Sequence, residues 1–192
     1  MKVHHTNLPG VLLVEPRVHK DERGFFLEVH HQERYAAAGI AGPFVQDNHS
    51  RSVELGVLRG LHAQRRFPQG KLVRCVEGRI FDVAVDIRRG SPHFGRWTAA
   101  ELSADNCHQL WVPPGFAHGF LVTAAPAQVE YKCTELYRPE DEISIAWDDP
   151  EIAIEWPLDG VAPILSNKDR AGQTLAQLAL RLPVFPAAAT ED

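Results

Sequence analysis

Two histidines and two basic residues mark the part of the sequence best suited to chemistry. Arg59 and Lys71 flank His62 in segments that are otherwise apolar, and His118 follows a Pro-Pro-Gly turn. Charged side chains are seldom buried without a partner, so these cations predict a polar pocket inside the protein. Such a pocket suits an anionic or oxygen-rich ligand, and a histidine titrates close enough to neutral pH to act there as an acid or a base.

Tyr131 is a further candidate for chemistry. Alternation along a predicted strand places it on one face with Val129 and Cys133. Two interpretations stay open: a core tyrosine whose hydroxyl finds a partner at the edge of the barrel, or a phenol aimed into the pocket that donates a proton. Residues 46–49, Gln-Asp-Asn-His, are unusually polar for the start of a strand and add candidates for ligand binding.

Two segments resemble the paired motifs of the cupin barrels. Residues 56–62 are Gly-Val-Leu-Arg-Gly-Leu-His, and residues 113–118 are Pro-Pro-Gly-Phe-Ala-His. In metal-binding cupins the first motif continues with a second histidine and then a glutamate. Here Gln64 replaces that histidine, and Pro68 and Gln69 stand where the glutamate is expected. A transition metal normally has three or four His, Cys or carboxylate ligands, so two histidines predict a barrel without a metal.

Short apolar segments separated by turn residues fill the middle of the chain. They cover residues 55–62, 70–77, 80–87, 108–112, 116–123 and 127–133, with strict alternation in residues 80–87. This period of two predicts half-buried strands, and turn signals at residues 77–78, 89–92, 113–115 and 126 predict that each strand is separate. Many short strands of this kind indicate an antiparallel barrel or a double-sheet jelly roll.

Helices are expected only toward the ends of the chain. A short one is predicted over residues 32–38, and a longer one over residues 171–182, where leucines recur at helical spacing before Pro183. Residues 186–192 look like a loose tail. No linker, internal repeat or low-complexity block interrupts the sequence, so residues 1–192 are expected to form a single domain.

The spacing of Arg59 and His62 makes a specific demand on the backbone. The two residues are three positions apart, so a regular strand would point their side chains to opposite faces. If both line the pocket, the chain must shift its pairing register between them. Gly60 is the natural place for a bulge.

Composition narrows the function classes. The 192 residues are 44% hydrophobic and 23% charged, with a formal net charge of -5, which argues against a nucleic-acid-binding protein. The first residues lack a signal-peptide pattern, and no segment approaches the roughly 20 apolar residues that cross a membrane. Cys75, Cys107 and Cys133 form no CxxC pair and are expected to be buried, reduced thiols. We therefore expect a cytoplasmic protein.

Several further segments are more distinctive than these general features. They are Gln-Gly-Lys-Leu-Val-Arg at 69–74, Phe-Asp-Val-Ala-Val-Asp at 81–86, Ser-Pro at 91–92, Tyr-Lys-Cys-Thr at 131–134, Trp-Asp-Asp-Pro at 147–150, Ile-Glu-Trp-Pro at 154–157 and Leu-Ser-Asn-Lys-Asp-Arg at 165–170. Together with residues 56–62 and 110–120, they resemble the dTDP-4-dehydrorhamnose 3,5-epimerase family. The resemblance runs in order through nearly the whole chain.

The resemblance implies a mainly β, cupin-like antiparallel jelly-roll barrel with a few short flanking helices, assembled as a homodimer. It implies epimerisation at C3 and C5 of dTDP-4-dehydro-6-deoxy-D-glucose, without a cofactor. By resemblance, His62 is the base that removes the protons next to the C4 ketone, and Asp169 orients and charges it. Tyr131 is the acid that returns a proton from the opposite face, and Lys71 lies near the C4 oxygen.

The family's binding positions carry over in the same way. In the family the N-terminal strands reach across the dimer, so Arg23 and Glu28 are expected to serve the neighbouring subunit. Phe26 and Tyr137 are candidate stacking surfaces, although packing explains Phe26 nearly as well. The residues implied to bind the nucleotide, diphosphate or sugar are Arg23, Phe26, Glu28, Gln46, Asn48, Arg59, His118, Tyr137, Glu142 and Lys168.

The sequence departs from the family at two places. Ala63 stands where tyrosine is common, and because it alternates away from His62 we expect it to affect packing or dimer contacts. Residues 65–68 are also atypical. Three alternatives stay open: an epimerase that inverts only C3 or only C5, a sugar-nucleotide-binding barrel without catalysis, and a metal-dependent cupin.

Overall fold

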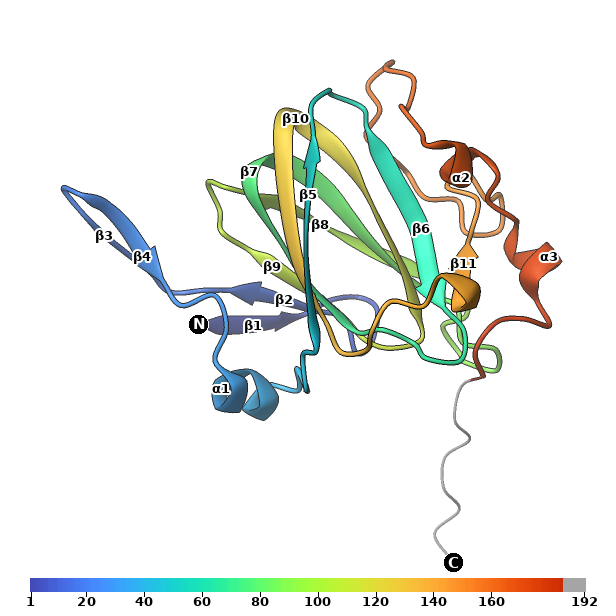
Figure 1. Ribbon diagram of the computed structural model, residues 1–192, viewed down its shortest axis with the longest axis horizontal. Coiled ribbons are helices and arrows are strands. Elements are labelled where there is room, and N and C mark those ends of the chain that lie inside the picture. The colour runs from blue at the N-terminus through green and yellow to red at the C-terminus, as the bar shows by residue number, and fades with distance from the viewer. Residues whose placement is uncertain (185–192) are drawn as a thin grey trace, which may run out of the picture.

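The structure is a computed structural model that describes residues 1–184. The tail predicted over residues 186–192 lies outside the described residues. Short strands dominate (Figure 1), which confirms the mainly β fold with few short helices. In chain order the elements are β1 (Lys2–His5), β2 (Leu12–Glu15), β3 (Val18–Asp21), β4 (Gly24–Leu27), α1 (Gln32–Ala37), β5 (Gln46–Ser52), β6 (Leu58–Gln64), β7 (Lys71–Asp86), β8 (Trp97–Ser103), β9 (Gln109–Val112), β10 (Phe116–Cys133), a 3-10 turn (Pro139–Asp141), β11 (Glu142–Ser144), α2 (Asn167–Arg170) and α3 (Leu175–Leu178).

The two longest strands, β7 and β10, take part in both layers of an antiparallel sandwich. The first half of β7 pairs with β9 and its second half with β8. Similarly, residues 118–121 of β10 pair with β6, whereas residues 127–133 pair with β5. The first layer therefore contains β1, β2, β9, β5 and residues 71–77 and 127–133, and the second contains β8, β6, β11 and the other halves of β7 and β10.

The chain passes from one layer to the other at two glycine- or proline-containing corners. Gly78 has a φ of +71°, and a Cβ there would lie 2.2 Å from the carbonyl oxygen of Pro126. The β7–β10 register shifts between Val122 and Val129, which lets both strands bend together. The prediction of separate strands at 70–77 and 80–87, and at 116–123 and 127–133, was therefore wrong: the turn signals bend two continuous strands.

The main core fills the space between the two layers. It contains Val73, Ile80, Leu110 and Val129, all essentially buried. A second core lies on the other side of the second layer, where the C-terminal segment covers it. There the leucines recognised by their spacing are buried side chains: Leu175, Leu178 and Leu182.

The predicted N-terminal helix is confirmed, and the predicted C-terminal one is corrected. α1 begins after His31, whose ring accepts the Arg34 N–H, and ends at Ala37. The helix expected over 171–182 is broken, with α2 ending before Ala171 and α3 covering one turn. The reason is backbone pairing before α3: the Gln173 N–H donates to the Ser144 carbonyl at 3.1 Å, and the Gln173 carbonyl accepts the Ala146 N–H at 2.9 Å. Gly172 allows this close approach, because a Cβ there would lie 2.8 Å from Ala146 N.

The hairpin formed by β3 and β4 projects from the sandwich (Figure 1). Its aromatic side chains are open to solvent, with Phe25 62% and Phe26 71% exposed. An isolated two-stranded hairpin is marginally stable at best. Because this hairpin projects from the sandwich, contacts with the rest of the chain add little to its stability. Within residues 1–184, no helix is long and apolar enough to cross a membrane.

Candidate active site

A cavity of about 380 Å³ opens between the two layers and collects most of the residues predicted for the site. Its walls come from β5, β6, β7, β10 and β11 and from the segment that leads into α2. The predicted residues that line it are Gln46, Asn48, Arg59, His62, Lys71, His118, Tyr131, Tyr137, Glu142, Lys168 and Asp169.

The backbone at Gly60 allows Arg59 and His62 to border the same cavity. His62 pairs with His118 and Arg59 with Phe120, so three residues of β6 match two of β10. This confirms the predicted register shift. Gly60 has a φ of +111°, and a Cβ there would lie 2.7 Å from the Gly119 Cα. Two glycines at the crossing therefore make the bulge possible.

His62 is held by a carboxylate from a distant part of the chain. Its Nε2 lies 2.6 Å from Oδ1 of Asp169, and the side chains are 23% and 4% exposed. Ser166 caps α2: its hydroxyl accepts the Asp169 N–H at 3.1 Å and donates to Asp169 Oδ2 at 2.6 Å. The same serine thus starts the helix and fixes the carboxylate.

The contacts of Asp169 decide which nitrogen of His62 is basic. Burial raises the pKa of the Asp169 carboxyl, but hydrogen bonds from His62, Ser166 and the Gly60 N–H outweigh it and lower the pKa below its ordinary value. An ionised carboxylate only accepts, so Nε2 of His62 carries the proton and donates it. In neutral His62 the lone pair is then on Nδ1, which faces no hydrogen-bond partner within residues 1–184.

Lys71 brings an uncompensated cation to the cavity. Its ammonium forms no hydrogen bond or ion pair with any residue that the structure describes, although its side chain is only partly exposed. Burial lowers the pKa of Lys71, and the nearby Cys133, Glu142 and Asp82 oppose that effect. An anionic ligand would restore the stability of the charged form.

Tyr131 reaches the cavity because β10 turns the corner between the layers. It is thirteen positions beyond His118, which a straight strand would spread over roughly 40 Å. Instead the two rings lie 6.5 Å apart. Burial raises the pKa of Tyr131, so its phenol is held in the protonated form. Tyr131 thus borders the cavity and also packs against the main core.

Polar residues at one side of the cavity form a connected group. Glu142 accepts from Lys168 Nζ at 2.9 Å and from the Tyr137 hydroxyl at 3.1 Å. Gln46 Nε2 donates to Asn48 Oδ1 at 3.0 Å. Their mutual bonds hold these long side chains in defined positions beside the cavity.

Arg59 is anchored next to them on β6. It donates to the Ser52 hydroxyl and to the Arg51 carbonyl oxygen, both at 3.2 Å. Since both partners are neutral, its charge is not cancelled and stays available to an anion.

Gln64 has a structural role where metal-binding cupins have a ligand. Its Nε2 donates to the Phe67 carbonyl at 2.7 Å, and its Oε1 accepts the Arg138 N–H at 2.7 Å. The atypical loop at 65–68 is further fixed by Asp141, which accepts the N–H groups of Arg66 and Phe67. These residues do not fit a metal site, and in residues 1–184 no three His, Cys, Asp or Glu side chains gather into one.

Three predicted binding residues lie away from the cavity, on or just beyond the projecting hairpin. Arg23 pairs with Asp21, and Glu28 pairs with Arg34. Phe26 is largely exposed. Within one chain these residues cannot reach a ligand in the cavity, so their assignment depends on a second subunit and stays a prediction.

Sequence reasoning missed three contributors. Ser166 was identifiable from Ser-Asn-Lys-Asp, in which a helix-capping serine precedes an acidic residue by three positions. Asp82 is the second: its Oδ1 lies 2.8 Å from Nε2 of the buried His118. In the sequence it is recognisable only as a carboxylate within a predicted strand. Ser50 lines the cavity on the same face as Gln46 and Asn48. Ala63, as expected, packs in the core beneath β6, and it also borders the cavity.

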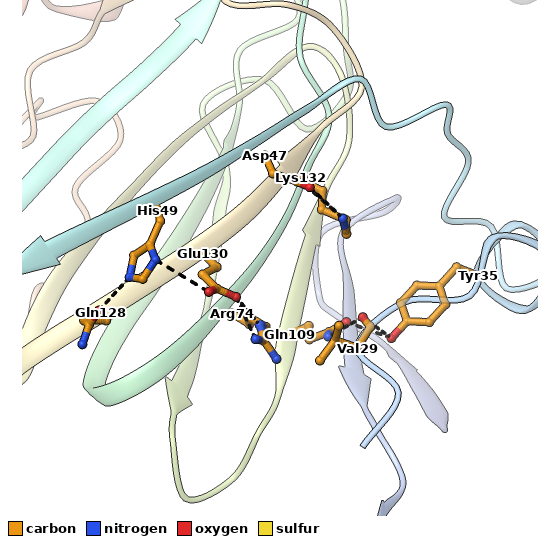
Figure 2. Close-up of polar contacts among 9 residues, drawn as sticks. All are labelled: Val29, Tyr35, Asp47, His49, Arg74, Gln109, Gln128, Glu130 and Lys132. Atoms are coloured by element: carbon orange, nitrogen blue, oxygen red, sulfur yellow. Dashed lines mark hydrogen bonds and ion pairs between the residues drawn. The ribbon is translucent and has the colours of Figure 1, made fainter. Parts of the chain in front are cut away.

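Alternate residues of the same strands face the opposite side of the first layer. We call Asp47, His49, Arg74, Glu130 and Lys132 the outer-face residues (Figure 2). Arg74 contacts Glu130 at 2.7 Å, and Lys132 contacts Asp47 at 3.0 Å. The His49 ring lies between Gln128 and Glu130. The charges here neutralise one another.

Of the cysteines, Cys75 and Cys133 are buried as expected, whereas Cys107 is partly exposed, and all three are free.

Comparison with known proteins agrees with this geometry. Residues 5–177 match the family model described as dTDP-4-dehydrorhamnose 3,5-epimerase. A protein of that name from Pseudomonas aeruginosa is 54% identical over 177 residues, covering 92% of this chain and 97% of that protein. A crystal structure of a dTDP-6-deoxy-D-glucose-3,5-epimerase from Legionella pneumophila in complex with dTDP-4-keto-L-rhamnose has a TM-score of 0.93 and 49% identity, covering 97% of this chain and 99% of that one.

A protein named for a different activity is also similar to this chain. A 3′-monoepimerase from Streptomyces bikiniensis, in complex with dTDP-quinovose, has a TM-score of 0.87 and 35% identity, covering 94% of this chain and 92% of that one. The same fold therefore occurs in proteins named as double and as single epimerases.

Proposed function

The chain belongs to the dTDP-4-dehydrorhamnose 3,5-epimerase family, and we propose that it inverts C3 and C5 of dTDP-4-dehydro-6-deoxy-D-glucose to give dTDP-4-dehydro-L-rhamnose. The observation that carries this proposal is the His62–Asp169 pair, 2.6 Å apart, in a cavity that also contains Tyr131 and Lys71, which has no ion-pair partner within residues 1–184. A base, a cation and an acid are the groups that epimerisation next to a ketone requires.

His62 is the base in this account. Nδ1 of the neutral ring takes the proton from C5 or C3, and the ring becomes an imidazolium whose charge the Asp169 carboxylate offsets. The low pKa of Asp169 supports this role, because the carboxylate remains ionised while the imidazole gains its proton.

Lys71 stabilises the charge that develops on the C4 oxygen. Removing a proton beside a ketone produces an enolate, and a fixed cation next to its oxygen stabilises the negative charge. The absence of any partner for Lys71 within residues 1–184 supports the assignment, since an ammonium already paired with a carboxylate would stabilise the enolate oxygen less.

Tyr131 returns a proton from the other side of the sugar. Inversion needs the proton to leave one face of the ring and arrive at the other, so two residues are required. His62 comes from β6 in the second layer and Tyr131 from the half of β10 in the first layer, an arrangement that supports opposite approaches. The raised pKa of Tyr131 keeps the proton on the phenol until the enolate takes it.

The nucleotide part of the substrate is assigned to the remaining cavity residues. Arg59, whose partners in the described part of the chain are neutral, suits the diphosphate. Tyr137 offers a stacking surface, and Gln46, Asn48, His118, Glu142 and Lys168 supply hydrogen bonds. No cofactor takes part in the proposed steps.

We also propose a homodimer in which the β3–β4 hairpin of each subunit reaches the other. The exposed Phe25 and Phe26 support a protein contact at the hairpin, and Arg23, Phe26 and Glu28 would then complete the partner's site. The chain is proposed to act as one domain in the cytoplasm, on a nucleotide sugar and not on nucleic acid.

Deuterium exchange tests the proposal and separates it from a single epimerase. With wild-type protein and substrate in D₂O, we expect deuterium at both C3 and C5 of the product, measured by NMR. Label at only one carbon would make the protein a single epimerase, like its Streptomyces relative. No label at either carbon, with dTDP binding intact, would mean a binding protein without catalysis.

A further inference from the structure

A second histidine–aspartate pair borders the cavity, and the proposed reaction gives its aspartate no task. Asp82 lies on β7 and contacts His118 on β10, with 2.8 Å between Oδ1 and Nε2. The pair is more buried than His62 and Asp169, with exposed side-chain fractions of 7% for His118 and 0% for Asp82. His118 itself lines the cavity.

Packing alone does not account for Asp82. Its Oδ2 is buried without a hydrogen-bond partner in residues 1–184, and such an orphaned acceptor costs about 1–3 kcal/mol. Asp86 provides the contrast four residues later on the same face of β7. It is equally buried, but Arg88 and Ser91 satisfy both of its oxygens. Asp86 therefore serves as the example of a buried aspartate with a purely structural role in this strand.

The contact with Asp82 determines how His118 meets a ligand. A carboxylate accepts, so Nε2 of His118 must donate, and only Nδ1 remains for the cavity. Nδ1 has no hydrogen-bond partner in the described part of the chain. His118 and Lys71, the cation assigned to the C4 oxygen, line the same cavity, and the charge of Asp82 partly opposes the lowering of the Lys71 pKa.

We propose that Asp82 is a positioning residue for the epimerisation and acts through His118. It fixes the ring with Nδ1 toward the substrate, so that this nitrogen forms a hydrogen bond with an oxygen of the bound sugar nucleotide. This rests on the proposed function, because the oxygen belongs to the substrate of that reaction.

A double-mutant cycle tests whether Asp82 acts through His118. The variants are Asp82→Asn, His118→Gln and the double variant, with kcat and KM measured separately by deuterium exchange. Asp82→Asn should lower kcat/KM by about 10- to 100-fold, the range known for carboxylate partners of metal-bound histidines. In the His118→Gln background the same change should have less than about a twofold effect. Effects that multiply in the double variant would overturn the proposal.

Asp86→Asn is the matched control, since it removes an equally buried charge from the same strand away from the cavity. It should lower the unfolding temperature and leave kcat of the folded protein unchanged. A loss of kcat equal to that of Asp82→Asn would overturn the proposal, because any buried charge in β7 would then matter alike.

A measurement on wild-type protein avoids reliance on folded variants. In ¹⁵N-histidine-labelled protein, dTDP-glucose should shift the Nδ1 resonance of His118 while Nε2 stays protonated. This ligand lacks the C4 ketone and so is not turned over. An unmoved Nδ1 would overturn the proposal. If wild-type protein exchanges no deuterium, the proposed function fails; if it does and Asp82→Asn matches it, only this inference fails.

Discussion

Alternate residues along β5, β7 and β10 lie in two different electrostatic environments. Toward the cavity, Lys71 and Tyr131 have no polar partner within residues 1–184. On the other side of the same layer, Arg74, Glu130 and Lys132 are paired (Figure 2). A period-two strand thus separates polar groups that satisfy one another from polar groups left for a ligand. Unpaired polar groups in a sheltered cavity indicate function more strongly than the number of charges does.

Replacing the histidine of the cavity and the histidine of the outer face should give the largest difference in the rate of deuterium exchange. His62→Asn should lower the rate of deuterium exchange by about 10²–10⁴-fold, because it removes the general base. His49→Asn, on the outer face, should change the rate by less than about twofold, since the His49 ring is half exposed and its polar partners among residues 1–184 are Gln128 and Glu130. Equal rate losses in both variants would contradict the comparison. The affinity of each variant for dTDP shows whether its cavity still binds the nucleotide.

The two basic residues of β7 give the next largest difference. Lys71→Met keeps the length of the side chain and removes the charge, so kcat should fall by about 10²–10³-fold, as for loss of one stabilising group at an oxyanion. Arg74→Met should leave kcat within about threefold, because Arg74 is already paired with Glu130. Steady-state kinetics on both variants measures this, and a larger loss for Arg74→Met would contradict the account.

Asp169 should contribute to stability in a pH-dependent way. Its pKa is lowered in the folded protein, so its contribution is complete above the ordinary value and is lost as pH falls through the folded value. Asp169→Asn should therefore reduce the free energy of unfolding at pH 7 by about 1–3 kcal/mol. Below about pH 4 the gap to wild type should narrow. Thermal unfolding across this range measures it, and a gap that widens in acid would contradict the assignment.

The smallest effect is expected on the outer face. Glu130→Gln breaks a contact between two partly exposed side chains, 28% for Arg74 and 38% for Glu130. The loss of stability should be below about 1 kcal/mol and should shrink further in high salt. Urea unfolding at two salt concentrations measures it. A loss well above that value would mean that another surface covers this face.

The sequence allowed prediction of what depends on local pattern. Strand alternation found the inward direction of Tyr131, and the spacing of Arg59 and His62 required the bulge at Gly60. The residues that line the cavity within one chain were largely identified, although their roles rested on the family resemblance.

What escaped prediction depends on contacts between distant segments. Turn signals at Gly78 and Pro126 mark corners, and only the paired bending of β7 and β10 reveals that the strands continue. Similarly, the C-terminal helix is interrupted where the backbone of Gln173 bonds to Ser144 and Ala146, a pairing of distant segments that helical spacing does not predict. The sequence could not pair Asp82 with His118, because the carboxylate would be buried in many different registers of β7 against β10.

A crystal structure with bound dTDP tests most directly that the unpaired side of the first layer is the working side. The account predicts nucleotide density in the cavity between the layers, with the diphosphate at Arg59 and its free end directed toward His62 and Lys71. Density against the outer-face residues Asp47, His49 and Lys132, with the cavity empty, would contradict it.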